Sequence, residues 1–102
     1  MEKEKAPQTR REALEQIRRE HSGNSISTQC ARLEAALDRL GSITTFEASR
    51  LLDIYHPPAR ALNLRKRGFQ ILTVRATVET EAGKRHRVGK YVLLARPQAV
   101  AT

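Results

Sequence analysis

The side chains best suited to bind a partner are basic, and they gather in two short stretches. The first, HPPARALNLRKRG, spans residues 56 to 68, and the second, GKRHR, spans residues 83 to 87. Guanidinium and ammonium groups at this density attract polyanions, and nucleic-acid phosphates release counterions when such groups neutralise them. The two stretches therefore predict a surface that binds a polyanion.

The distribution of charge strengthens that prediction. The chain has 102 residues and a formal net charge of +8. Up to residue 55, nine Lys and Arg residues balance nine Asp and Glu residues, whereas from residue 56 onward ten basic residues face only Glu79 and Glu81. The whole excess of positive charge therefore lies in the part of the chain from residue 56 onward. The alternative is a basic surface that is merely solvated.

The sequence gives little support for catalysis, for metal or cofactor binding, or for binding of single-stranded RNA. No nucleophile, base and acid can be assembled into a catalytic set, and no phosphate-binding loop or pair of closely spaced histidines is present. Cys30 is the single cysteine, so it has no partner for an internal disulfide. We therefore expect no enzymatic activity, no metal and no cofactor. Two Tyr and two Phe residues are too few for the stacking platform of a single-strand RNA binder.

The chain also lacks the features of a membrane or secreted protein. No apolar run approaches the roughly 18 residues of a membrane span, and the beginning, MEKEKAPQTRRE, is charged throughout. We therefore expect a cytoplasmic protein.

A first helix is predicted between Ser25 or Ser27, which can serve as N-cap, and Gly41, which can end it. Apolar residues at steps of four and three form one stripe along it. The stripe is made of Ile26, Cys30, Leu33, Leu37 and Leu40, whereas Arg32, Glu34, Asp38 and Arg39 lie mostly outside it. Cys30 is thus expected in the core.

A short extended entry and a second helix are predicted over residues 41 to 52. Thr44 and Glu47 have the spacing of a capping box. Ala48, Leu51 and Leu52 mark the inner face.

The third helix is predicted over residues 58 to 67. Prolines fit the first turn of a helix, and Gly68 can end it. Ala61 and Leu64 fall together and should point inward, which leaves the small, amide and basic side chains outside.

After Gly68 the pattern alternates with a period of two. This predicts antiparallel strands over residues 70 to 79 and 86 to 94, joined by a turn in which Gly83 supplies the positive φ. The residues outside this unit are expected to be tails. Residues 1–24 form a charged, flexible segment, in which 9 to 20 are a frayed helix, a disordered stretch or a dimer arm, and residues 95–102 form the C-terminal tail. The domain itself is placed at 25–94.

This order of elements predicts an α+β fold, a winged helix-turn-helix with three helices followed by a two-stranded β-hairpin wing. The segments ARALNLRKRGFQI and GKYVLL resemble the N-terminal DNA-binding domain of bacterial biotin repressors. Several further segments resemble small winged helix-turn-helix DNA-binding proteins of bacteria, prophages and plasmids over about residues 26 to 94. Those segments are TT-EA from Thr44, HP-AR from His56, LRKRG from Leu64, and GKRHRV with YVLL from Gly83.

The resemblance implies double-stranded DNA as the partner, with the helix at 58–67 in the major groove and the wing at 80–87 on the backbone or in the minor groove. In that arrangement Asn63 suits adenine, Arg60 or Arg67 suits guanine, and Ala59 or Leu62 suits a thymine methyl. Arg65 and Lys66 suit phosphates. The full set of candidate DNA-binding residues is Thr45, Arg50, Ala59, Arg60, Leu62, Asn63, Lys66, Arg67, Lys84, Arg85 and Arg87.

The expected role is a sequence-specific transcriptional regulator or an accessory factor of a mobile element, acting as a homodimer or beside a partner protein. The resemblance also implies a bacterial protein that is associated with the nucleoid when bound to DNA. The alternative is a winged-helix interaction module that binds an acidic protein partner.

Overall fold

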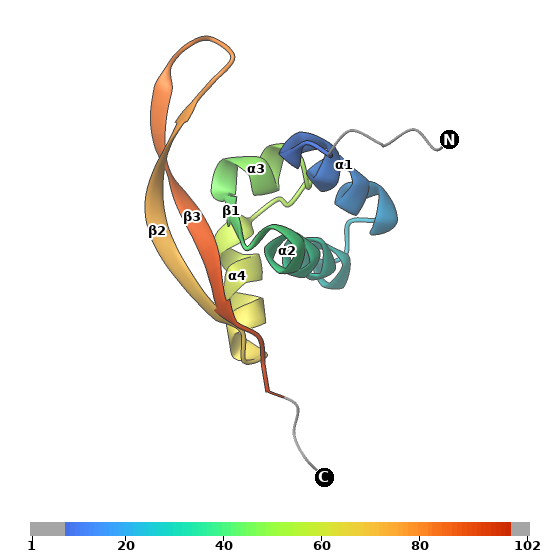
Figure 1. The fold of residues 1–102 in the computed structure, drawn as a ribbon. Helices are drawn as coiled ribbons and strands as arrows, with labels where there is room; N and C mark the ends of the chain where they lie inside the picture. Colours follow the sequence, from blue (N-terminus) through green and yellow to red (C-terminus); the bar gives the residue numbers. More distant parts are fainter. Residues whose placement is uncertain (1–7, 99–102) are drawn as a thin grey trace, which may run out of the picture.

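The computed structural model describes residues 8–98, which form a bundle of helices packed on a twisted antiparallel sheet (Figure 1). The predictions for residues 1–7 and 99–102 lie outside this range. The elements, in chain order, are α1 (Arg10–Glu20), α2 (Ile26–Leu40), β1 (Ser42–Thr44), α3 (Thr45–Arg50), α4 (Pro57–Lys66), β2 (Gln70–Glu79) and β3 (Arg85–Ala95).

Helix α2 begins and ends at the residues that the sequence indicated, and α3 begins at its predicted cap but ends at Arg50, before the predicted limit of residue 52. The Ser25 hydroxyl accepts the Thr28 N–H at 3.0 Å, and Gly41 ends α2 with a φ of 80°. At α3 the Thr44 hydroxyl accepts the Glu47 N–H at 3.0 Å, while the Glu47 carboxylate accepts the Thr44 N–H at 2.9 Å. This reciprocal pair is the predicted capping box.

Helix α4 starts at Pro57, one residue earlier than predicted, and buries Ala61 and Leu64 completely. Its end depends on Gly68, whose φ of 101° favours glycine. A Cβ at that position would also lie 3.2 Å from the Pro97 side chain, which is closer than an ordinary van der Waals contact. The chain therefore leaves α4 in a sharp turn directly into β2.

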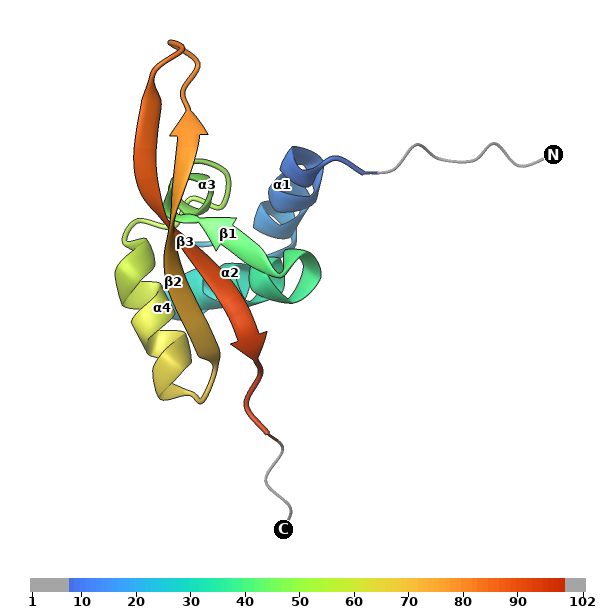
Figure 2. The same ribbon diagram turned by 60° about the vertical axis from the view of Figure 1, so that its left-hand side comes forward.

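The sheet has three strands in the order β1-β3-β2, because the extended entry to α3 pairs with the predicted hairpin. Ile43 lies opposite Tyr91 on β3, and the Gly41 carbonyl accepts the Leu93 N–H at 2.9 Å. The hairpin itself agrees with the prediction. Its tip is closed by a hydrogen bond from the Thr80 N–H to the Lys84 carbonyl, and Gly83 has a φ of 78°. Figure 2 shows the hairpin extending well beyond the helices.

The structure contradicts the expectation that residues 10 to 20 form a frayed helix or a disordered segment. They form α1, and its apolar residues Leu14 and Ile17 are both 0% exposed. Two side chains suffice because they complete a core already built by α2. Polar contacts add to this, since Arg10 forms an ion pair with Glu47 at 2.6 Å and Arg39 forms one with Glu20 at 2.6 Å. Helix α1 is therefore part of the folded unit.

Two side chains of α2 also differ from the prediction. Ile26, expected on the buried stripe, is 58% exposed, because it lies in the first turn beyond the edge of the core. Arg32, expected outside, is only 2% exposed. Its guanidinium donates to the carbonyls of His21, Gly23 and Asp53 at 2.6, 2.8 and 3.3 Å, which compensates for its burial.

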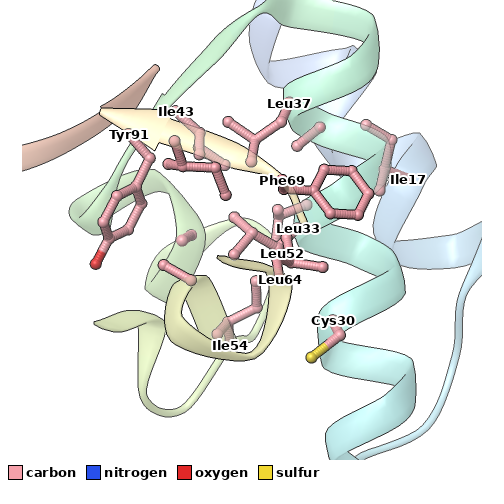
Figure 3. Packing of buried hydrophobic residues seen from close by; sticks show 14 of the residues in the cluster. Ile17, Cys30, Leu33, Leu37, Ile43, Leu52, Ile54, Leu64, Phe69 and Tyr91 are labelled. Atoms are coloured by element: carbon pink, nitrogen blue, oxygen red, sulfur yellow. The ribbon is translucent and has the colours of Figure 1, made fainter. Parts of the chain in front are cut away.

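The core lies between α2, α4 and the inner face of the sheet. Figure 3 shows Leu33 and Leu37 of α2 beside Ile43, Leu64 and Phe69. Cys30 lies at the rim of this cluster and is 6% exposed, as expected for a core residue. Within residues 8–98, no helix is both long and apolar enough to cross a membrane.

Candidate nucleic-acid interface

The exposed stripe of α4 is narrow and largely apolar at its centre. Pro58, Leu62 and Lys66 follow one another at steps of four and are exposed, with Leu62 at 49%. Ala59 is partly exposed beside them. A stripe of this kind fits a groove in which thymine methyls meet apolar atoms and Lys66 meets an acceptor.

The flank of α4 that faces α2 carries three of the predicted DNA-binding residues, and two of them have partners within the protein. The Cys30 thiol donates to Asn63 Oδ1 at 3.8 Å, and burial raises the pKa of that thiol. Arg67 forms an ion pair with Glu34 at 3.2 Å and lies over the Phe69 ring. Arg60 is partly buried, and its Nε has no partner among the described residues.

The opposite flank of α4 is held to the sheet by Arg65. Its guanidinium donates to the Ile71 carbonyl at 2.8 Å and to the Thr73 hydroxyl at 2.8 Å. It also lies 6.0 Å from the centre of the Tyr91 ring. Burial raises the pKa of Tyr91, and the positive charge of Arg65 acts in the opposite direction. Arg65, predicted to contact phosphate, therefore already fixes the position of α4 against β2.

An open groove of about 510 Å³ runs between α4 and the wing. Its lining includes Thr45, Arg65, Thr73, Arg75 and Tyr91. Gly89 lets the start of α3 approach the sheet, because a Cβ there would lie 3.3 Å from the Thr45 methyl. The groove is thus built by contributions from α3, α4, β2 and β3.

The wing continues the surface that this groove begins. Thr73 lies opposite Tyr91, Arg75 opposite Gly89 and Thr77 opposite Arg87, so these residues share one face of the hairpin. That face is the one that Arg65 contacts. Arg75 and Arg87 are exposed, and neither forms an ion pair within residues 8–98. Their charges are therefore available to a ligand.

The remaining predicted residues lie near the wing tip. Lys84 and Arg85 are exposed, and Arg85 lies opposite Glu79. Arg50 forms an ion pair with Glu81 at 3.3 Å and lies over the Phe46 ring at 5.3 Å. Arg50 thus connects α3 to the tip.

Arg75 was absent from the candidates drawn from the sequence. The signal was present, because Arg75 and Thr77 alternate with Val74, Ala76 and Val78 and so had to share a face.

Within residues 8–98 no group of three or more His, Cys, Asp or Glu side chains is placed to hold a metal ion.

Two helices joined by a tight turn, the second presenting an exposed face beside a basic hairpin, define a winged helix-turn-helix, a class of DNA-binding domain. The family model described as a winged helix-turn-helix domain matches residues 28–96, and the chain belongs to that family. No curated protein and no solved structure matches the chain.

Proposed function

We propose that this DNA-binding protein recognises a specific double-stranded sequence, as a transcriptional regulator or as an accessory factor of a mobile element. Helix α4 enters the major groove, and the outer part of the wing, which includes residues 80–87 at its tip, contacts the backbone or the minor groove. The observation that carries the proposal is the juxtaposition of the exposed stripe of α4 with a wing face whose arginines have no ion pair among the described residues.

Base recognition is assigned to the exposed stripe of α4 and to the flank of α4 that faces α2. Leu62 and Ala59 contact thymine methyls, because both side chains are apolar and accessible. Asn63 pairs with adenine after it gives up the long contact with the Cys30 thiol, which costs little because a thiol is a weak donor. Arg60 and Arg67 serve as the guanine contacts, Arg67 by exchanging its carboxylate partner for a base.

Positioning on the duplex is assigned mainly to charged side chains that form no ion pair among the described residues. Arg75, Lys84, Arg85 and Arg87 of the wing contact phosphates, and Lys66 does so at the end of α4. Thr45 adds a hydroxyl from the groove between α3 and the wing. Arg50 contributes once Glu81 is displaced.

Titration of a random duplex at two salt concentrations tests the proposal. Tight binding at low salt with a steep loss on added salt is expected, because phosphate contacts release counterions. Absence of binding at low salt would exclude DNA as the partner. It would leave the alternative, an interaction module whose basic surface binds an acidic protein.

Selection of bound sequences from a random duplex pool tests specificity. Leu62→Ala and Asn63→Ala should each relax the preference at one base pair, at a cost of roughly 1–3 kcal/mol. Arg85→Ala is the matched control, since loss of a phosphate contact weakens all sequences alike. Uniform weakening by all three variants would contradict the assignment of base-reading residues.

A homodimer fits this function, because one winged helix covers a short site and two copies cover a symmetric one. Light scattering at micromolar protein, with and without the selected duplex, distinguishes a dimer in solution from one that forms on DNA. A monomer in both states would exclude the homodimer.

A further inference from the structure

We propose a second phosphate-binding site at the corner between α1 and α2, which contacts the DNA backbone on the side of α4 away from the wing. The corner is the end of α1 with the loop that follows it, residues 18 to 24, together with Arg32 and Asp53. This inference builds on the proposed function and adds a contact surface that neither the recognition helix nor the wing contains.

The corner is an open polar groove of about 380 Å³. Its lining consists of Arg18, Arg19, Ser22, Gly23, Asn24, Arg32 and Asp53. Three arginines and one aspartate line the groove, so the charges that line it sum to a positive value. Small residues, Ser22, Gly23 and Asn24, line the rest of it.

Arg18 and Arg19 are exposed and form no ion pair within residues 8–98. The acids nearest to them on the helix have other partners. Glu15 pairs with Arg11 at 3.1 Å, and Glu20 pairs with Arg39 at 2.6 Å. Both free arginines therefore keep their full charge for a ligand.

Arg32 makes the corner rigid and adds charge beneath it. Its hydrogen bonds to the His21, Gly23 and Asp53 carbonyls join the α1–α2 loop to the loop before α4. Carbonyl oxygens satisfy its donors without neutralising the cation, and its buried Nε has no partner among the described residues. A phosphate bound at the mouth of the groove compensates this charge.

The corner lies beside the start of α4. The Gln29 side chain donates to the Asn24 carbonyl at 2.8 Å and accepts the Tyr55 N–H at 3.1 Å, which places the two loops side by side. His56 then precedes the first residue of α4. A helix in the major groove, about 12 Å wide, has a phosphate strand along each side. The wing is placed to contact one strand, and the corner is placed to contact the other.

Helix α1 lies before the residues that the family model matches, which are 28–96. The arginines at its end are therefore an addition to the matched domain. Because Leu14 and Ile17 anchor α1 in the core, the addition is held at a fixed place relative to α4.

The test compares the salt dependence of duplex binding for the full chain and for the double variant Arg18→Gln/Arg19→Gln. Each lost phosphate contact should reduce the slope of log K against log salt by about 0.9, so the expected change is about 1.8. Between 50 and 200 mM salt the unmodified protein should accordingly lose about tenfold more affinity than the variant.

Arg18→Lys/Arg19→Lys is the matched control, because it keeps both positive charges at the same exposed positions and leaves the pairs of Glu15 and Glu20 intact. Its slope should equal that of the unmodified protein. An unchanged slope for the double Gln variant, or an equal decrease in both variants, would overturn the proposed site while leaving DNA binding intact. Absence of binding by the unmodified protein would instead overturn the proposed function together with the site.

Discussion

The helical part of the molecule and the wing use arginine in different ways. Among the helices, Arg10, Arg39 and Arg67 each form an ion pair with a carboxylate on another element. In the wing, Arg75 and Arg87 form none within residues 8–98. The paired arginines connect elements of the fold, whereas the wing arginines have no role in holding it. The α1–α2 corner is the exception, a piece of the helical part that resembles the wing.

This difference predicts that substitutions in the two regions change different properties of the protein. Substitutions of buried residues in the helical part should lower the free energy of unfolding, and substitutions of exposed arginines in the wing should lower affinity for DNA. The following experiments test that separation.

The largest effect is expected at Leu14, which is fully buried although α1 contributes only two such residues. Leu14→Ala should lower the free energy of unfolding by about 3 kcal/mol, because it leaves a cavity in the core. Urea denaturation measures the loss. Ile26→Ala is the control, since Ile26 is 58% exposed, and should change stability by less than about 0.5 kcal/mol. Equal values for the two variants would mean that α1 does not stabilise the core.

Arg32→Ala should cost about 2 kcal/mol of unfolding free energy, because three carbonyls lose their donor. Thermal unfolding checks it. Arg85→Ala removes an arginine from the exposed wing and should leave the melting temperature unchanged. A similar decrease in melting temperature for Arg85→Ala would contradict the distinction between the helical part and the wing.

Within the wing, opposite faces should behave differently. Arg87→Ala should weaken duplex binding by about fivefold, roughly 1 kcal/mol, because Arg87 shares the face that Arg65 contacts. Lys90 lies on the same strand at odd spacing from Arg87, hence on the other face. Lys90→Ala should weaken binding by less than twofold in fluorescence anisotropy at matched salt. Equal losses would show that only total charge matters.

The smallest effect concerns acid stability through Glu47. Burial raises the pKa of this carboxyl, but the Arg10 guanidinium and the Thr44 N–H outweigh burial and hold the pKa below its ordinary value. The charged form is therefore favoured by folding. Its stabilisation is present above the unfolded pKa and is lost as pH falls through the folded pKa.

Glu47→Gln should consequently flatten the loss of stability on acidification. Urea unfolding from about pH 6 to about pH 3 measures it, a range that brackets the ordinary pKa of glutamate. Glu79→Gln, at an exposed position of the wing, is the control and should keep the slope of the unmodified protein. Parallel curves for Glu47→Gln and the unmodified protein would contradict the assignment.

The elements that could be predicted were those with local signals. The Thr44 and Glu47 spacing, the prolines before α4 and the positive φ at Gly68 and Gly83 depend on neighbours within a few residues, so the chain alone indicates them. The packing of α1 into the core was not predicted, because two apolar residues are a weak signal until the rest of the core is known. Its burial is decided by α2, not by its own sequence.

The same limit applies to the interface. The basic character of α4 and the wing tip follows from composition, but the partners of individual residues do not. Arg67 meets Glu34 across 33 positions, and Arg32 is buried because carbonyls of two distant loops converge on it. The face shared by Arg75 and Arg87 was open to prediction, because each strand alternates strictly and the turn at Gly83 sets the register between the two strands.

The hydrogen bonds by which Arg65 joins α4 to β2 affect how the protein recognises the shape of DNA. Because that arginine joins the helix to the strand at 2.8 Å, the spacing between helix and wing is set before any duplex arrives. A duplex whose grooves do not match this spacing has to bend or twist, and stiff and pliable base steps differ in what that deformation costs. The protein should therefore discriminate among base pairs that none of its side chains touch.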